Sequence, residues 1–134
     1  MSFLIDTDVL SALRRPDRNA SVRAWLEANA DQEMFLSVIT IGEIRRGIEL
    51  KRSRDARGAL ALETWLDELK LAYRHHILAV DTEIAETWGR LTSAKPQHAT
   101  DALIAATALV RELTVVTRNR RHFAGFPVPV IDPF

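Results

Sequence analysis

The chain of 134 residues contains no cysteine. This absence excludes disulfides, thiolate nucleophiles and zinc sites with cysteine ligands, and it is compatible with a reducing compartment. The chemistry open to the protein therefore rests on carboxylates, hydroxyls, histidines and metal ions. A hydrophobic content of 47% over this length is enough for one ordinary core, so we expect a single domain over residues 1–134.

Long hydrophobic runs are also missing. The apolar stretch within the N-terminal MSFLIDTDV is too short for a secretory signal, and no basic residue precedes it. No later segment approaches the roughly 18 apolar residues that a membrane-spanning helix needs. We therefore expect a soluble, cytoplasmic protein with no membrane partner.

The chain has no excess of charge, because 18 Lys and Arg residues balance 18 Asp and Glu residues. A global positive field of the kind found on many nucleic-acid binders is therefore absent, and any contact with nucleic acid must be local. Basic residues do gather locally, within 14–18, 45–57 and 118–122. Each such run taken singly is more often a solvated surface than a binding site.

Short apolar runs alternate along the chain with longer segments in which apolar residues recur at helical spacing. The strand candidates are residues 3–5, 34–38, 77–80, 113–117 and 128–131. The helix candidates are residues 9–15, 21–29, 40 onward, 56–73, 84–91 and 101–110. Pro127 and Pro129 restrict the last strand to an edge of the sheet, because proline has no N–H to donate. The alternation predicts the α/β class, with a three-layer α/β/α sandwich around a mostly parallel sheet of four to five strands.

Local signals indicate where the helices begin and end. Thr40 is predicted to cap the helix after the second strand, with Glu43 completing a capping box in the first turn. Thr100 is predicted to cap the apolar helix that follows it. Pro16 is predicted to close the first helix, and a loop is predicted around residues 95–97.

Three carboxylates stand where otherwise apolar elements begin or end. Asp6, with Asp8 close behind, follows the first strand, Glu43 lies near the start of a helix, and Asp101 opens a helix with no other charge before Arg111. A helix-capping role is the alternative for Asp101 taken alone. Charged groups at the margin of a core are costly unless they are paired or bind a metal. Because the carboxyl ends of parallel strands meet at one edge, these acids are expected to converge there and to hold Mg²⁺ or Mn²⁺.

Four stretches of the sequence together resemble one family. They are FLIDTDVLSAL, SVITIGEIRRGIEL, HATDALIAATAL and TVVTRNRRHFAGF, in that order along the chain. The chain resembles the PIN-domain ribonuclease toxins of the VapC type, from toxin–antitoxin systems, over essentially its whole length. The resemblance implies a parallel α/β/α sandwich, Mg²⁺-dependent hydrolysis of phosphodiester bonds in RNA, homodimerisation and inhibition by a cognate antitoxin protein.

The resemblance also assigns roles to residues. Asp6, Glu43 and Asp101 match the family's catalytic, metal-binding carboxylates, and Thr7 and Thr117 match small hydroxylated residues that border the pocket. Two further residues, in the turn after the fourth strand, stand where relatives often carry an additional acid; they are Asn119 and His122. We expect Asn119 to border the pocket and His122 to be a phosphate contact or a surface residue, so any second metal site is weakened.

Basic residues beside the acids are predicted to contact the RNA, because a polyanion would otherwise be repelled. Arg46 lies three residues after Glu43 and shares its helix face, whereas Arg45 is turned about 160° away. The same contact is predicted for Arg118, Arg120 and Arg121. Apolar stripes on two helices predict the homodimer; they lie around Trp65 and Leu69 and around Trp88 and Leu91.

Two other functions remain open at this stage. Asp6-Thr7-Asp8-Val9 after an apolar strand also matches the nucleophile motif of haloacid-dehalogenase-like phosphatases. That class needs a lysine on a later element, and Lys70 and Lys95 are poorly placed for it. The other alternative is a catalytically inactive PIN-like module that binds RNA or a partner, which the missing acid near Asn119 keeps open.

Overall fold

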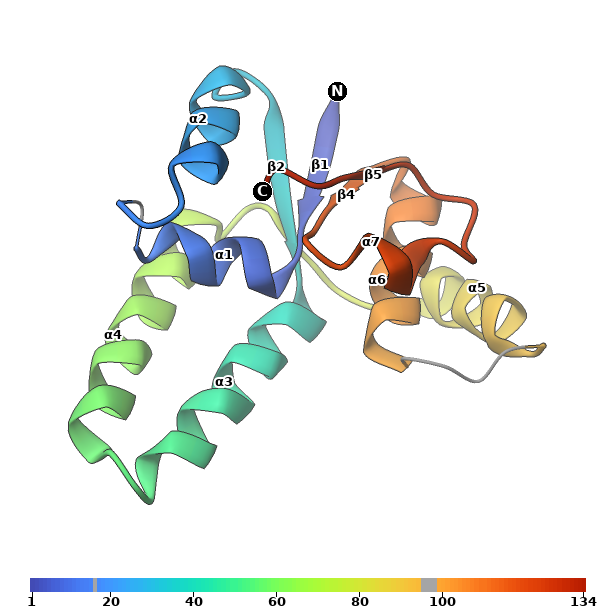
Figure 1. Cartoon of the computed structure of the whole chain (residues 1–134). Helices are drawn as coiled ribbons and strands as arrows, with labels where there is room; N and C mark the ends of the chain where they lie inside the picture. The colour runs from blue at the N-terminus through green and yellow to red at the C-terminus, as the bar shows by residue number, and fades with distance from the viewer. Residues whose placement is uncertain (16, 95–98) are drawn as a thin grey trace.

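A computed structural model describes residues 1–15, 17–94 and 99–134 (Figure 1). Its strands are β1 (Ser2–Ile5), β2 (Glu33–Ser37), β3 (Ile77–Leu78), β4 (Thr114–Val116) and β5 (Val130–Ile131). Its helices are α1 (Thr7–Leu13), α2 (Ala20–Ala28), α3 (Val38–Arg52), α4 (Ala56–Ala72), α5 (Thr82–Thr92), α6 (Ala99–Arg111) and α7 (Arg120–Phe123). Each predicted strand and long helix is present, and α7 is a short helix that the polar run after β4 did not predict.

The strands form one parallel sheet in the order β3-β2-β1-β4-β5. Leu4 of the central strand lies opposite Phe35 on one side and Val115 on the other. β5 is an edge strand, as its prolines require, and Pro129 takes part only as an acceptor, receiving the Val115 N–H at 3.0 Å. The predicted α/β sandwich with a parallel sheet is confirmed.

The central strand β1 serves two apolar cores because successive side chains of a strand point to opposite faces. Phe3 and Ile5 join the core shared with α1 to α4, whereas Leu4 joins the core shared with α6 and α7. Figure 1 shows these two sets of helices on opposite sides of the sheet, with α5 packed outside α6. All three side chains are at most 2% exposed, so the strand that leads into Asp6 is packed on both faces.

The predicted helix caps need correction. Ser37, not Thr40, caps α3: its backbone is extended, and its Oγ accepts the Ile39 N–H at 3.0 Å. The chain turns directly from β2 into the helix, so Thr40 is inside α3 and Glu43 lies in the second turn rather than the first. Thr100 is likewise inside α6, which begins at Ala99. The predicted stop at Pro16 and the loop at 95–97 fall outside the described residues.

Helices α3 and α4 form a long antiparallel pair below the sheet (Figure 1). The α4 stripe around Trp65 and Leu69 packs into the core with α1 and α3, because Leu69 is 9% exposed and Trp65 is half-buried against the same cluster. Arg45 of α3 reaches Glu63 of α4 at 2.6 Å. In the described ranges, no helix combines the length and apolar character that crossing a membrane would require.

Candidate active site

Asp6 is held at the carboxyl end of β1, where it caps α1. One of its carboxylate oxygens accepts the Thr7 N–H at 2.9 Å, and the other accepts the hydroxyl of Thr117, also at 2.9 Å. Thr117 follows β4, the neighbour of β1 in the sheet, so the parallel pairing brings the two residues together. Asp6 is only 6% exposed and Thr117 is fully buried.

The environment of Asp6 raises its pKa to about 6. Burial is the largest cause, followed by the charge of Asp8, and the charge of Asp101 adds to the same effect. The hydrogen bonds from Thr7 and Thr117 act in the opposite direction because they favour the ionised carboxylate. Asp6 therefore lies within electrostatic reach of two other acids, one of them from the distant helix α6.

Asp8 is a member of this group that the sequence reasoning did not assign to the site. One of its carboxylate oxygens accepts the Arg118 N–H and the Asn119 side-chain amide, both at 3.1 Å. The other oxygen is buried and has no hydrogen-bond partner among the described residues. Burial raises the pKa of Asp8 as well. The signal that points to it is its position two residues after Asp6, at the same strand end.

Glu43 enters the site from α3. It is half-buried, and its carboxylate accepts the hydroxyl of Thr7 at 2.9 Å. Thr7 thus touches two acids, since its backbone N–H binds Asp6 and its side chain binds Glu43. The structure places Thr7 and Thr117 on either side of Asp6, each with its hydroxyl directed to a carboxylate.

Asp101 lies in the first turn of α6, with its side chain 18% exposed. His122 of α7 faces it, and the His122 Nδ1 atom is 2.9 Å from a carboxylate oxygen of Asp101. The expectation for His122 was a phosphate contact or a surface position, and neither anticipated this pair. The pairing needs α7 to turn back toward the start of α6, and the sequence carries no local signal for that turn.

The donor set suits a hard divalent cation, because all four acids offer oxygen atoms and one buried oxygen of Asp8 has no hydrogen-bond partner in the described part of the chain. Within the described residues, however, no three or more His, Asp or Glu side chains stand ready to hold one ion together. Glu43 is turned to Thr7 and Asp101 to His122. A cation with one or two direct carboxylate ligands and several waters, the usual arrangement for Mg²⁺, fits such a site.

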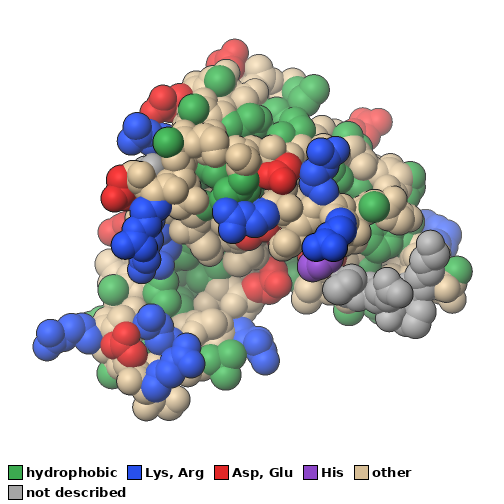
Figure 2. Space-filling view, in the orientation of Figure 1, with side chains coloured by type: hydrophobic (Ala, Val, Ile, Leu, Met, Phe, Trp, Pro, Cys, Tyr) green, Lys and Arg blue, Asp and Glu red, His purple; other side chains and the backbone are tan. Residues whose placement is uncertain are grey.

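Basic residues stand on the same elements as these acids or their partners: Arg46 follows Glu43 on α3, and Arg120 and Arg121 precede His122 on α7. Figure 2 shows Lys and Arg side chains at the rim of a hollow in the middle of the visible face, with acidic side chains inside it. Arg46, Arg120 and Arg121 are exposed and form no salt bridge in the part of the chain that the structure describes. Arg118 differs, because its guanidinium stacks on Phe134 at 3.8 Å from the ring centre.

A groove between α1, α3 and α4 continues from the acidic pocket. It encloses a cavity of about 280 Å³ whose lining includes the polar Thr7 and Glu43 and the apolar Ile48, Leu62 and Trp65. The cavity thus combines an apolar lining with one of the site's acids.

Comparison with known proteins agrees with this architecture. The family model for the PIN domain matches residues 3–127. The chain is 33% identical to toxin FitB of Neisseria gonorrhoeae over 98% of each chain. It is 27% identical to VapC ribonuclease Y4jK of Sinorhizobium fredii, over 98% of this chain and 97% of that protein. A solved structure of FitAcB from Neisseria gonorrhoeae superposes with a TM-score of 0.85 and 32% identity, over 98% of this chain and 97% of the other.

The chain belongs to the PIN-domain family and, within it, to the VapC/FitB type of toxin. The resemblance noted in the sequence is therefore confirmed, and the haloacid-dehalogenase alternative is excluded. PIN nucleases are metal-dependent enzymes, which agrees with the oxygen-rich pocket.

Proposed function

We propose that this VapC-type PIN endoribonuclease, the toxin of a type II toxin–antitoxin system, hydrolyses RNA at the pocket around Asp6, Glu43 and Asp101. Asp8 is a fourth member, and Mg²⁺ is the cofactor, with Mn²⁺ as a substitute. The observation that carries the proposal is the buried Asp6, whose pKa rises to about 6 beside Asp8 and Asp101. Acids crowded in this way are stabilised in their charged forms by a cation.

Each acid is oriented by groups of the chain itself. Asp6 is held by Thr7 and Thr117, Asp8 by Asn119, and Glu43 by the Thr7 hydroxyl. A divalent cation in the pocket would supply the Lewis acidity that phosphodiester hydrolysis requires. Hydrogen bonds already hold Asp6 and Asp8 at the pocket, whereas Glu43 and Asp101 would turn from Thr7 and His122 to reach a cation.

The RNA backbone needs compensating positive charge near so many carboxylates. Arg46, Arg120 and Arg121 meet that need, since they are exposed beside the acids and free of salt bridges among the described residues. Arg118 is a weaker candidate because its guanidinium stacks on Phe134. We assign the three unpaired arginines to steering the RNA phosphates.

We further propose that a cognate antitoxin covers the groove between α1, α3 and α4. Solved structures of relatives include FitAB bound to a DNA fragment and a toxin–antitoxin complex from Klebsiella pneumoniae. An antitoxin segment with an apolar side chain against Trp65 and a basic one near Glu43 would match the groove's lining. Such a segment would exclude RNA from the acids.

The remaining proposals concern the whole molecule: a single PIN-like nuclease domain over residues 1–134, a cytoplasmic location and a homodimer. Of the two stripes predicted for the dimer, the one around Trp65 and Leu69 is used inside the core. The stripe around Trp88 and Leu91 is half-buried and is the better candidate. Light scattering at micromolar concentration tests it, and a strictly monomeric mass would count against a dimer.

The central experiment is cleavage of total RNA by the purified protein with Mg²⁺, with Mn²⁺ and with a chelator. We expect cleavage that requires the metal, and its loss in Asp6→Asn and in Asp101→Asn, which should also relieve growth arrest on expression. Asp31→Asn removes an exposed acid in the turn before β2, at the amino ends of the strands and away from the site; it is the matched control. Absence of metal-dependent cleavage would favour the inactive binding module, and full activity of either site variant would disprove the assigned site.

A further inference from the structure

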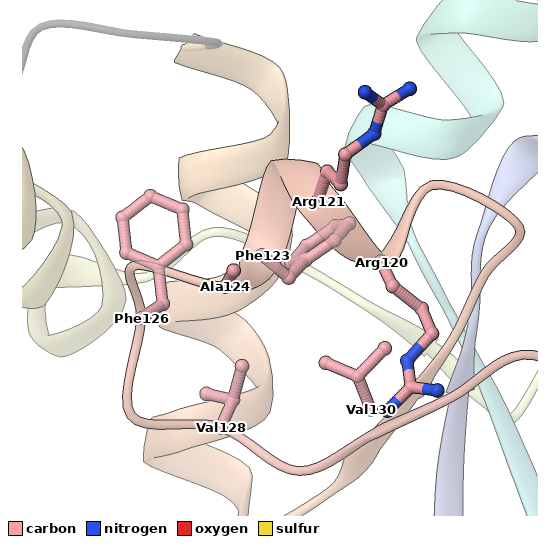
Figure 3. A pocket seen from close by; sticks show the side chains of 7 residues that line it. All are labelled: Arg120, Arg121, Phe123, Ala124, Phe126, Val128 and Val130. Atoms are coloured by element: carbon pink, nitrogen blue, oxygen red, sulfur yellow. The ribbon is translucent and has the colours of Figure 1, made fainter.

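A second cavity, of about 330 Å³, lies beside the carboxylate pocket and is not part of it. It is formed by α7 and the chain that runs from α7 to β5. Its lining includes Arg120, Phe123, Phe126, Val128 and Val130 (Figure 3). Phe126 and the two valines are half-buried, so apolar surface is presented to whatever enters.

The cavity is joined to the acidic pocket by one short helix. Asn119, just before α7, donates its side-chain amide to Asp8 at 3.1 Å, and His122 within α7 contacts Asp101 at 2.9 Å. Arg120 lies between these two contacts in the sequence. Whatever occupies the cavity therefore lies against the same short helix whose neighbouring residues contact two acids of the proposed site.

The charge on the rim of the cavity is available to a ligand. Neither Arg120 nor Arg121 forms a salt bridge among the described residues, in contrast to Arg45 and Arg52, which both contact Glu63. In Figure 3 the side chain of Arg120 lies beside Val130, whereas that of Arg121 points away from the valines. Arg120 is thus the cation that lies alongside the apolar lining.

We propose that this cavity is a subsite for one unpaired nucleotide of the RNA substrate. The base packs against Phe126, Val128 and Val130, and a phosphate of the same strand pairs with Arg120. An aromatic surface for a base next to a cation for a phosphate is the usual chemistry of single-strand recognition. The inference rests on the proposed function, because a nucleotide held in the cavity would bring the neighbouring phosphodiester bond of the same strand to the acids.

A nucleotide suits the cavity better than a protein surface does. Stable protein interfaces bury more than about 1,000 Å² in total, whereas a cavity of about 330 Å³ is of the size that small ligands occupy. Its mixed character, apolar on one side with a guanidinium alongside, matches a nucleotide, which also combines an apolar face with an anion. The subsite holds the substrate strand and takes no part in bond breaking.

The experiment compares two fluorescently labelled 12-nucleotide single strands, one ordinary RNA and one in which the bases are removed. Binding is measured by anisotropy in chelator, and KM and kcat for the ordinary strand are measured with Mg²⁺. Phe126→Ala should weaken binding of ordinary RNA about fivefold or more and raise KM, with kcat and abasic binding unchanged. Arg120→Ala should weaken binding of both strands, and Phe126→Tyr should bind like the wild type.

Two control variants remove an apolar side chain and an arginine at sites away from the cavity. Leu71→Ala removes an exposed apolar side chain, 64% exposed, and Arg74→Ala removes an exposed charge near the start of β3, at the opposite edge of the sheet. The subsite is disproved if Phe126→Ala weakens both strands equally or matches Leu71→Ala. It is also disproved if Phe126→Ala alters the oligomeric mass without altering RNA binding. Wild-type cleavage that persists through such results would leave the ribonuclease assignment intact, whereas failure of wild-type cleavage would remove that assignment instead.

Discussion

The Nδ1 atom of His122 lies 2.9 Å from a carboxylate oxygen of Asp101, which ties α7 to the first turn of α6. Both side chains are partly shielded, Asp101 at 18% and His122 at 39% exposed. The imidazole therefore limits the rotation of a carboxylate that we assign to the metal site. Partners of this kind commonly matter to metal sites almost as much as the ligands they orient.

The first prediction concerns His122 as a positioning residue for Asp101. His122→Ala should lower Mg²⁺ affinity and cleavage about 10- to 100-fold. His122→Asn should retain most of both, because its amide nitrogen can stand where Nδ1 stands. Calorimetric titration of Mg²⁺ and steady-state cleavage give the two readouts. Equal behaviour of the Ala and Asn variants would contradict the positioning role.

The second prediction follows from the pKa of Asp6, which burial and the charges of Asp8 and Asp101 raise from 3.8 to about 6. The folded state then holds this proton more tightly than the unfolded chain does. In metal-free protein, the contribution of Asp6 to the free energy of unfolding is fully present below about pH 4 and falls by up to about 3 kcal/mol as pH rises past 6.

Asp6→Asn should abolish that fall, so the variant should be more stable than the wild type at pH 7 in chelator. Added Mg²⁺ should stabilise the wild type and leave Asp6→Asn unchanged. Urea unfolding at pH 4, 5, 6 and 7 measures the difference, with Asp31→Asn as the control that keeps the wild-type slope. A wild type and an Asp6→Asn variant with parallel pH profiles would refute the prediction.

The third prediction concerns Thr117, whose buried hydroxyl donates to Asp6 at 2.9 Å and accepts the Asn119 N–H at 3.1 Å. Thr117→Val keeps the shape and removes both hydrogen bonds, which should cost about 1–3 kcal/mol of unfolding free energy. Thr117→Ser keeps the hydroxyl and should lose less. Urea unfolding at pH 7 and Mg²⁺ calorimetry test both variants. The prediction is contradicted if Thr117→Val matches Thr117→Ser in both stability and Mg²⁺ affinity.

The fourth prediction separates two neighbouring arginines. Arg46→Ala should weaken RNA binding and reduce its salt dependence by about one ion, with thermal stability unchanged. Arg45→Ala should affect RNA less and lower the melting temperature slightly, because Arg45 pairs with Glu49 and Glu63. Glu43 accepts a hydrogen bond from the Thr7 hydroxyl and forms no salt bridge with Arg46. The Mg²⁺ affinity of Arg46→Ala should therefore be unchanged. Anisotropy at two salt concentrations is the test, and unchanged RNA binding by Arg46→Ala would disprove steering.

The local pattern of apolar and polar residues was enough to predict much of the fold. Apolar runs located the strands, helical spacing located the long helices, and prolines at 127 and 129 placed β5 at an edge. The predicted cap of α3 was wrong because two residues with a hydroxyl group, Ser37 and Thr40, both stand near the start of the helix. Which one caps the helix depends on where the backbone leaves the extended strand, and that is decided by how β2 pairs with its neighbours.

The sequence by itself determined the fold class and the family, and it predicted Asp6, Glu43 and Asp101 as the acids of the site, because each of these depends on residue types and their order along the chain. Only the tertiary structure decided which groups meet: Thr7 with Glu43, Asn119 with Asp8, and His122 with Asp101. These contacts join residues far apart in the chain, and their geometry follows from strand order and helix packing. Neither of these is written in any local segment, since hydrogen bonds need positions accurate to a few tenths of an ångström.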